Sequence, residues 1–247
     1  MTLTVLRSLI CVVLVLVSSS VNGATIITIN DVTYTFNKPP RLADVLAPVA
    51  LQEDWYWPAS NLFLLKDTEI NKKRDEVIAK LEKLHLSVSS KAKEQQALTT
   101  FIKQIKEWKL AKRVQLVIDY DFARIEANLN PMFEEGNYLL NLVTRPSKIN
   151  VFGALSGETT ISHKNVADVS DYLSELSVLH HGNKDYVYII QADGKAMQVP
   201  YAYWNKGHQE IMPGSQLYIP FKTQFFATDN QQLNEQIVFL ATNRILP

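Results

Sequence analysis

The chain has 247 residues, 47% of them hydrophobic, and its 25 basic side chains balance 25 acidic ones. This apolar content is enough for one large or two small globular domains and argues against an extensively disordered chain. The neutral balance also argues against a general binder of polyanions, so no nucleic-acid partner is predicted.

Residues 1–23 have the pattern of a secretory signal peptide, in which Arg7 precedes an apolar run over Leu9–Val17. We expect cleavage after Gly23 and an exported product. The run is too short to cross a bilayer core of about 30 Å. Because the only cysteine, Cys11, lies in this segment, the exported chain is expected to have neither a disulfide nor a cysteine nucleophile.

The first structural unit is predicted to begin with a β-hairpin and a short helix. Two β-branched runs, over residues 25–29 and 32–36, flank an Asn30-Asp31 pair that is typical of a two-residue hairpin turn. Apolar residues at helical spacing over 41–51 then predict a helix. Further strands are expected over residues 114–118, 122–125 and 138–144.

Two longer helices interrupt this sheet pattern. Asp67 or Thr68 is expected to cap the first helix, and a serine-rich break precedes the second. We interpret residues 66–112 as a helical hairpin inserted into the first unit. Between Lys66 and Arg113 there are 13 basic and 7 acidic residues, an excess that either attracts an anionic polymer or reflects solvated helix faces.

A second unit begins at Arg145-Pro146 and repeats the order of the first, with two strands, a short helix and more strands. The Glu134-Glu135-Gly136-Asn137 turn before one strand parallels Pro213-Gly214-Ser215-Gln216 before another. The sequence therefore predicts an α+β protein of two tandem β-grasp domains. The predicted segments are a signal peptide over 1–23, a first β-grasp domain over 24–144 with the helical insert 66–112, a second over 145–225, and a C-terminal helix over 226–247.

The C-terminal segment from Asp229 to Arg244 predicts an amphipathic helix, with Leu233, Ile237 and Leu240 along one side. Such a helix is about 24 Å long, and its polar side chains are costly in lipid, so alone it cannot span a membrane. Its apolar stripe either packs on the protein's own sheet or docks on a partner or at the membrane interface.

None of the familiar catalytic patterns is present. Gly153–Gly157 departs by one position from a nucleophile elbow and is interpreted as a hairpin turn. The histidines are scattered without zinc-binding spacing, so no metal, cofactor or catalytic residue is predicted. Asp119 and Asp121 carry an alternative hypothesis, a carbohydrate-modifying enzyme with a pair of carboxylates, although turn-forming residues are the simpler interpretation.

Three tryptophans and one arginine are the candidate ligand-binding residues. Trp55 and Trp57 share one side of an extended segment, and Trp204 lies in a second aromatic run. Such rings either stack on sugars or pack in the core. Arg113 lies where the basic insert returns to the sheet, and its guanidinium can bind a carboxylate or phosphate or form a structural ion pair.

These motifs together resemble the GfcC family. Its members are exported proteins encoded with group 4 capsule and related exopolysaccharide operons of Gram-negative bacteria, and they include the YjbG branch. The resemblance extends over the whole chain after residue 23. It rests on Trp57-Pro58, Arg145-Pro146, Gly153-Ala154-Leu155-Ser156-Gly157, Asp171-Tyr172-Leu173, Trp204-Asn205-Lys206, His208, Pro213-Gly214-Ser215-Gln216-Leu217 and Leu233-Asn234-Glu235-Gln236-Ile237.

The resemblance implies two β-grasp domains similar to the ligand-binding modules of outer-membrane polysaccharide export channels, with a helical insert and an amphipathic C-terminal helix. It also implies that Arg113 lies in a small pocket, although Val114-Gln115 and the Glu134-Glu135-Gly136 turn depart from the family pattern. We therefore expect a non-enzymatic periplasmic accessory protein for capsule or exopolysaccharide assembly or export.

The expected partners are an acidic or neutral polysaccharide and an outer-membrane polysaccharide export protein. A contact of the C-terminal helix with the membrane interface is the alternative to its packing on the protein's own sheet. A further hypothesis is purely interactional, because this helix alone could dock into the export machinery while the two sheets act as spacers.

Overall fold

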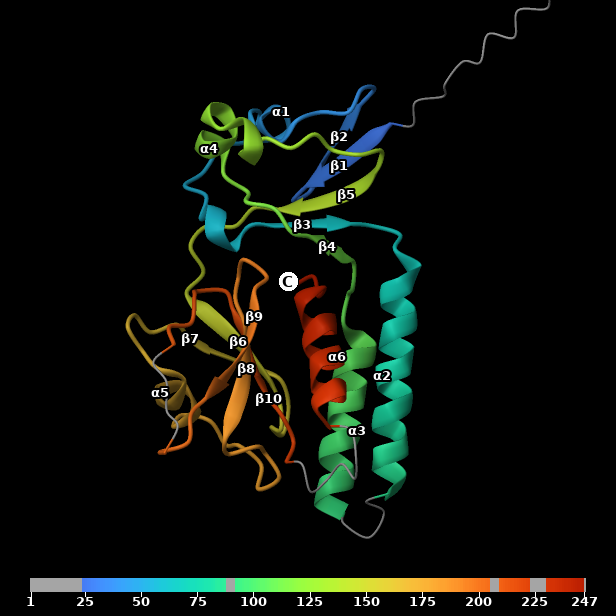
Figure 1. Cartoon of the computed structure of the whole chain (residues 1–247), viewed down its shortest axis with the longest axis vertical. Helices are drawn as coiled ribbons and strands as arrows, with labels where there is room; N and C mark the ends of the chain where they lie inside the picture. The colour runs from blue at the N-terminus through green and yellow to red at the C-terminus, as the bar shows by residue number, and fades with distance from the viewer. Residues whose placement is uncertain (1–23, 88–91, 205–208, 223–229, 247) are drawn as a thin grey trace, which may run out of the picture.

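The computed structural model describes residues 24–87, 92–204, 209–222 and 230–246. The predicted signal peptide lies outside these ranges. Two five-stranded sheets follow one another along the long axis of the molecule, and three long helices run beside the second sheet (Figure 1). The predicted α+β class is therefore confirmed.

Both sheets have the same topology. The strand orders are β2-β1-β5-β3-β4 and β7-β6-β10-β8-β9. In each sheet the first and last strands of the unit pair in parallel at the centre, and the other neighbours are antiparallel. This is the β-grasp arrangement, so the predicted tandem pair is confirmed. The strands are β1 (Thr25–Ile29), β2 (Val32–Phe36), β3 (Asn61–Leu64), β4 (Lys112–Val114), β5 (Gly136–Asn141), β6 (Lys148–Gly153), β7 (Thr159–Ser162), β8 (Tyr186–Ile190), β9 (Ala196–Pro200) and β10 (Gln216–Ile219).

The first hairpin forms as its sequence predicts. Ile29 pairs with Val32 across the two-residue turn, where Asn30 adopts a positive φ of 50°. Asparagine tolerates this left-handed conformation better than most residues. Its side-chain oxygen also accepts a hydrogen bond from the Leu142 backbone N–H at 2.9 Å. The turn is thus fastened to the end of the central strand β5.

Two local predictions for the first unit were wrong, and one strand was missed. The strand expected over 122–125 is a helix, α4 (Tyr120–Ile125), because the Asp119 carboxylate accepts the Phe122 N–H at 3.0 Å and caps it. Of the strand expected over 114–118, only Val114 lies in a strand, at the end of β4. Strand β3 was not predicted, since four residues with a mixed pattern give no clear period of two.

Short helices connect the strands. The helix expected over 41–51 is only α1 (Leu42–Leu46), which lies after the first hairpin, as α5 (Val169–Leu173) lies after the second. Both begin with a capping box, formed with Asp44 in α1 and with Asp168 and Asp171 in α5. The short 3₁₀ helices are η1 (Trp57–Ala59) and η2 (Ala127–Leu129).

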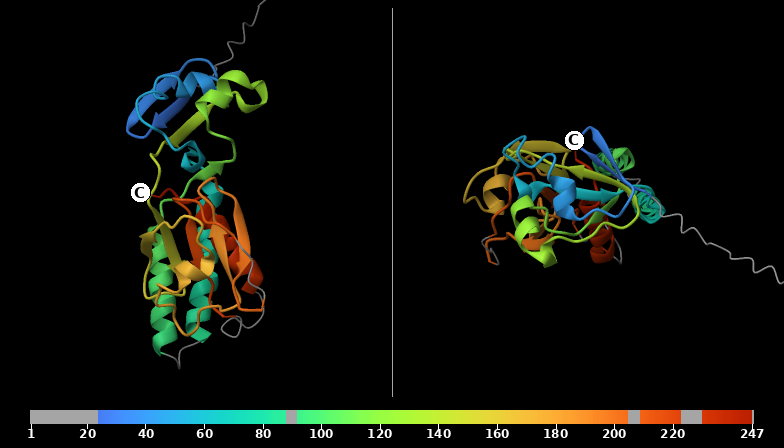
Figure 2. Two further views of the ribbon diagram at one scale, coloured as in Figure 1. Left: turned by 90° about the vertical axis from the view of Figure 1, so that its left-hand side faces the viewer. Right: turned by 90° about the horizontal axis from the view of Figure 1, so that it is seen from above.

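The inserted hairpin consists of α2 (Thr68–Ser87) and α3 (Ala92–Glu107). It leaves the first sheet after β3 and returns at β4, yet it runs alongside the second sheet (Figure 1). The C-terminal helix α6 (Asn230–Thr242) packs against α2 and completes this helical layer. Figure 2 shows from two further directions that the three helices stay beside the second sheet.

The protein has two hydrophobic cores of unequal size. The core of the first unit lies between its sheet and helices α1 and α4, and includes Ile27 and Leu42. The larger core of the second unit also takes side chains from α2, α3 and α6. Phe101 of α3 stacks there on Tyr218 and Phe152, with centroid separations of 6.1 and 6.4 Å. The sequence did not predict that the insert belongs to the second core.

The apolar stripe of α6 is also buried in this second core. Leu233, Ile237 and Leu240 are each at most 5% exposed. Of the two alternatives for this stripe, the structure shows packing on the protein's own sheet and helices. Within the described ranges, every helix is too short or too polar to cross a bilayer.

Candidate functional site

Arg113 lies where the two β-grasp units meet. It belongs to the edge strand β4, and its backbone N–H donates to the Asn243 side-chain oxygen at 2.9 Å. Its guanidinium Nη2 reaches the second unit and donates to the Ala192 carbonyl oxygen at 2.6 Å. The arginine therefore bridges the first sheet, the end of α6 and the β8–β9 turn.

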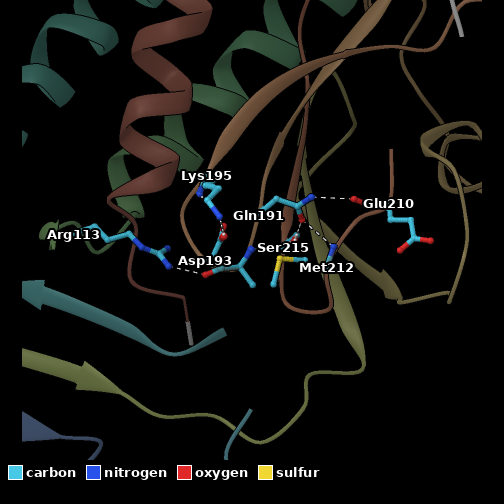
Figure 3. A network of polar contacts seen from close by, with 8 residues as sticks. Arg113, Gln191, Asp193, Lys195, Glu210, Met212 and Ser215 are labelled. Carbon is cyan, nitrogen blue, oxygen red and sulfur yellow. Dashed lines mark hydrogen bonds and ion pairs between the residues drawn. The ribbon is translucent and has the colours of Figure 1, made fainter. Parts of the chain in front are cut away.

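The β8–β9 turn is held by a buried glutamine (Figure 3). Gln191 donates from Nε2 to the Glu210 carbonyl, and its Oε1 accepts hydrogen bonds from the Met212 N–H and the Ser215 hydroxyl, all at 2.9 Å. Ser215 Oγ in turn accepts the Ala192 N–H at 3.1 Å. These bonds fix the Ala192 carbonyl to which Arg113 donates.

Gly194 allows this turn to approach the arginine closely. Its φ is +90°, and a Cβ atom at this position would lie 2.6 Å from Arg113 Nε. Only glycine adopts such a backbone conformation without strain, and any side chain here would displace the guanidinium. The contact between the units therefore depends on glycine at this position.

Arg113 carries a charge that is poorly compensated. Burial lowers the pKa of its guanidinium to about 10, and the nearby Asp193 opposes that shift. Among the described residues no carboxylate oxygen lies within 4 Å of its nitrogens, and Asp193 pairs with Lys195 at 2.8 Å. The structural ion pair considered for Arg113 is thus not formed within this part of the chain.

Arg113 lines a cavity of about 350 Å³ between the two units, here called the cation cavity because three of its lining side chains are cationic. Its basic lining residues are Arg113, Lys148 and Arg244, and none of its lining residues in the described ranges is acidic. Arg244 is already paired with Glu158, at 2.7 and 3.0 Å. The Gln216 side-chain oxygen, also in the lining residues, is buried without a hydrogen-bond partner in the described structure. The remaining lining residues are Ala59, Asn61, Phe63, Asn141, Val143, Pro146, Ser147, Asn150, Thr160, Ile190, Gln191, Ala192, Gly214 and Leu246.

The structure does not bring the three candidate tryptophans together. Trp55 packs partly buried against the core of the first unit and donates its indole N–H to the Val49 carbonyl at 2.8 Å. Trp57 touches the same core and also lines a second cavity near Arg113. Trp204 is 75% exposed and lies beyond the opposite end of β9 from the turn that meets Arg113. Of the three, only Trp57 lies near the contact between the units.

The two aspartates proposed as an acid–base pair have different settings. Asp119 is the cap of α4 and lines the second cavity, whereas Asp121 is exposed on the first turn of the helix and is not a lining residue there. No group of three or more potential metal ligands occurs among the described residues.

The functional residues that sequence analysis missed come mainly from the second unit. Lys148 and Gln216 begin neighbouring strands, β6 and β10, and reach the cavity only because the second sheet meets the first there. Pro213-Gly214 was noticed only as a turn. The Pro213-Gly214 turn before β10 is the one sequence signal that points to this region.

Two family models match separate parts of the chain. Residues 22–145 match the family model described as capsule biosynthesis GfcC, N-terminal, and residues 157–246 match capsule biosynthesis GfcC C-terminal. The chain is also 28% identical over 212 residues to uncharacterized protein YjbG from Escherichia coli (strain K12), covering 85% of each chain.

Proposed function

Because the chain belongs to the GfcC family of capsule biosynthesis proteins, we propose that it is a non-enzymatic periplasmic accessory protein for capsule or exopolysaccharide assembly or export. It contacts an acidic polysaccharide through the cation cavity. The polymer then leaves through an outer-membrane polysaccharide export protein, which is the second proposed partner.

The observation that carries this proposal is the poorly compensated charge of Arg113. Its guanidinium is partly removed from water and donates to one backbone carbonyl among the described residues, which leaves other N–H groups for a ligand. A carboxylate matches that fork with two parallel hydrogen bonds. The carboxylate of a uronic acid unit would supply the missing negative charge, and a cavity of about 350 Å³ is within the range of small-ligand sites.

Two features favour binding over chemistry at this site. In the part of the chain that the structure describes, the cation cavity is lined by no carboxylate, so it lacks the general acid that cleavage of a sugar linkage requires. Asp119, a carboxylate of the alternative hypothesis, does not line this cavity and uses one oxygen to cap α4. The cation cavity therefore does not favour the carbohydrate-modifying alternative.

A deletion strain tests the role in the cell. We expect less polysaccharide on the cell surface and restoration of the wild-type amount by the intact gene. Restoration should fail with Arg113→Gln. An unchanged amount of surface polymer in the deletion strain would refute the accessory role.

Calorimetry with the purified chain tests the binding site itself. The probe is an oligogalacturonide, whose carboxylates stand in for an acidic polymer. Arg113→Gln should weaken binding by about tenfold or more, since hydrogen bonds to charged groups contribute about 1.5–3 kcal/mol. The matched control is Arg124→Gln, an exposed arginine on α4 that does not line the cation cavity. Equal affinity of both variants would refute the assignment of Arg113.

A further inference from the structure

A second cavity lies at the same junction between the two units. It has a volume of about 420 Å³ and is here called the aromatic cavity. Trp57 and Phe122 supply its rings, and Ser60, Asp119 and Asp193 are among its polar lining residues. The two cavities have no lining residue in common.

The two cavities share a wall. Arg113 lines the cation cavity, whereas Gln115, two residues further along the chain, lines the aromatic cavity. The β8–β9 turn alternates in the same way, with Ala192 on one side and Asp193 on the other. The hydrogen bond from Arg113 to the Ala192 carbonyl joins two lining residues of the cation cavity beside this wall. When one sugar of a polymer occupies one cavity, the second cavity lies next to it for a neighbouring sugar of the same polymer.

The aromatic cavity exposes apolar surface that the fold does not cover. Phe122 is 46% exposed and Val117 is 54% exposed, although both are large apolar residues. Trp57 is held from behind by the core of the first unit, so its ring is a fixed part of the wall. A pyranose ring has one face of C–H groups that packs on such rings and a rim of hydroxyls that needs polar partners.

Polar partners are present at the edge of this apolar surface. The Ser60 hydroxyl belongs to a residue only 5% exposed and has no hydrogen-bond partner among the described residues. Asp119 uses Oδ1 for the Phe122 N–H, which leaves its other carboxylate oxygen as an acceptor. A buried hydroxyl without a partner is costly, and a ligand hydroxyl would relieve that cost.

The charges of the two cavities differ in sign. The charged lining residues of the aromatic cavity are Asp119, Asp193 and Lys195, and the last two form an ion pair with each other. Asp119 is thus the charge left without an opposite partner, so this cavity disfavours an anionic sugar. Its carboxylate instead accepts hydrogen bonds from uncharged hydroxyls.

From these observations we propose that the aromatic cavity binds a neutral hexose unit of the polysaccharide, with its C–H face on Trp57 and Phe122 and its hydroxyls on Ser60 and Asp119. This inference rests on the proposed function, because it assigns a second subsite for the same polymer. An acidic unit then occupies the cation cavity while a neutral unit occupies the aromatic one. The protein would select polymers that contain both kinds of sugar.

The indole N–H signals of the four tryptophans test this assignment. They are Trp55, Trp57, Trp108 and Trp204, identified in the spectrum by single substitution with phenylalanine. Neutral tetrasaccharides of glucose, mannose and galactose serve as probes with the full exported chain. We expect the Trp57 signal to shift with millimolar probe while that of the buried Trp108 stays in place. A Trp57 signal unmoved by every neutral probe, or a shift confined to Trp204, would overturn the proposal.

Variants separate binding from folding. Ser60→Ala should lower the affinity for the neutral probe roughly threefold to tenfold, because one hydrogen bond to the sugar is removed. The same change should raise the melting temperature of the protein, because it also removes an unpaired buried hydroxyl. A higher melting temperature with unchanged affinity would show that Ser60 does not contact the sugar.

Phe122→Ser should weaken binding of the neutral probe and leave the affinity for the oligogalacturonide unchanged. If Arg113→Gln weakens binding of the oligogalacturonide only, the two subsites are distinct. If the wild-type chain binds the neutral probe but no oligogalacturonide, the cation cavity is refuted while this inference stands.

Discussion

The two β-grasp units have the same strand order, but their sheets are covered differently. In the first unit the central strand β5 alternates between buried and partly exposed residues, as expected for a sheet with one covered face. In the second unit every residue of β10 is buried. Tyr218 faces α6, where its hydroxyl bonds Asn234 at 2.8 Å, and Leu217 points to the opposite face of the sheet. The second sheet is therefore covered on both faces.

The additional layer over the second sheet comes from distant parts of the chain. Helices α2 and α3 belong by sequence to the first unit, and α6 follows the last strand. The two units share one topology but differ in whether each forms its core from its own segments. The first covers its core with its own helices, whereas the second needs residues 68–107 to complete its core. A boundary drawn at Arg145 divides the sheets but not the folding units.

The largest expected effect comes from removing residues 230–247. This change exposes the core face of α2 and the second sheet, and it leaves the Tyr218 hydroxyl without its partner. We expect loss of cooperative thermal unfolding in the second unit, measured by near-ultraviolet circular dichroism and amide hydrogen exchange. A truncated protein with native hydrogen exchange in β8 and β10 would contradict this expectation. That result would instead favour the hypothesis that α6 serves only as a docking element.

The next largest effect is expected from Phe101→Ala. Phe101 is 1% exposed and stacks on the second sheet, so its loss should cost about 3–5 kcal/mol of unfolding free energy in urea. Its matched control is Leu42→Ala in the first core, with an expected cost of about 2–5 kcal/mol. Hydrogen exchange should accelerate in β6 and β10 for Phe101→Ala. Acceleration in β1 and β5 instead would show that the insert stabilises its own unit.

A smaller effect is expected from Gly194→Ala at the contact between the units. The positive φ and the close approach to Arg113 should together cost about 1–3 kcal/mol. Because the guanidinium must move, binding of oligogalacturonide should weaken as well. Gly157→Ala is the control, since a Cβ there meets its nearest atom at 3.9 Å. Unaltered affinity in Gly194→Ala would show that the turn does not position the arginine.

The smallest effect is expected from Lys106→Gln on the helical insert. Lys106 pairs with Glu82 at 2.8 Å and joins α3 to α2, but both side chains are about half exposed. Exposed pairs of this kind contribute about 0.2–1 kcal/mol. The unfolding free energy should fall by less than that upper value, and the difference should vanish in high salt. A greater loss would mean that the ion pair, rather than the apolar stripe, holds the insert together.

Local signals in the sequence were sufficient for much of the fold. The Asn30-Asp31 hairpin, the helices α2, α3 and α6, and the repeated order of elements all follow from turn residues and apolar spacing. The strand predicted over 122–125 was wrong because β-branched and aromatic residues outweighed the capping signal of Asp119. Strand β3 was missed because a four-residue strand carries little pattern of its own.

The candidate site was predictable only in part. Arg113 was identified from its place at the end of the basic insert, and Trp57 from its aromatic neighbours. Lys148, Gln191 and Gly194 were not identified, because they approach Arg113 from more than 30 residues away in sequence. Such pairings depend on how the second sheet meets the first. A single sequence carries no direct signal of that arrangement.

The bond between Asn243 and Arg113 has a consequence for the order in which the molecule is made. The chain is synthesised from its N-terminus, so β4 exists long before the segment that fastens it. Ala111 and Arg113 donate their backbone N–H groups to Asn243, and Lys109 accepts one from Ile245. A nascent or prematurely terminated chain therefore lacks an anchored Arg113. If Arg113 binds a polysaccharide as proposed, we expect a chain cut short before Asn243 to bind it more weakly.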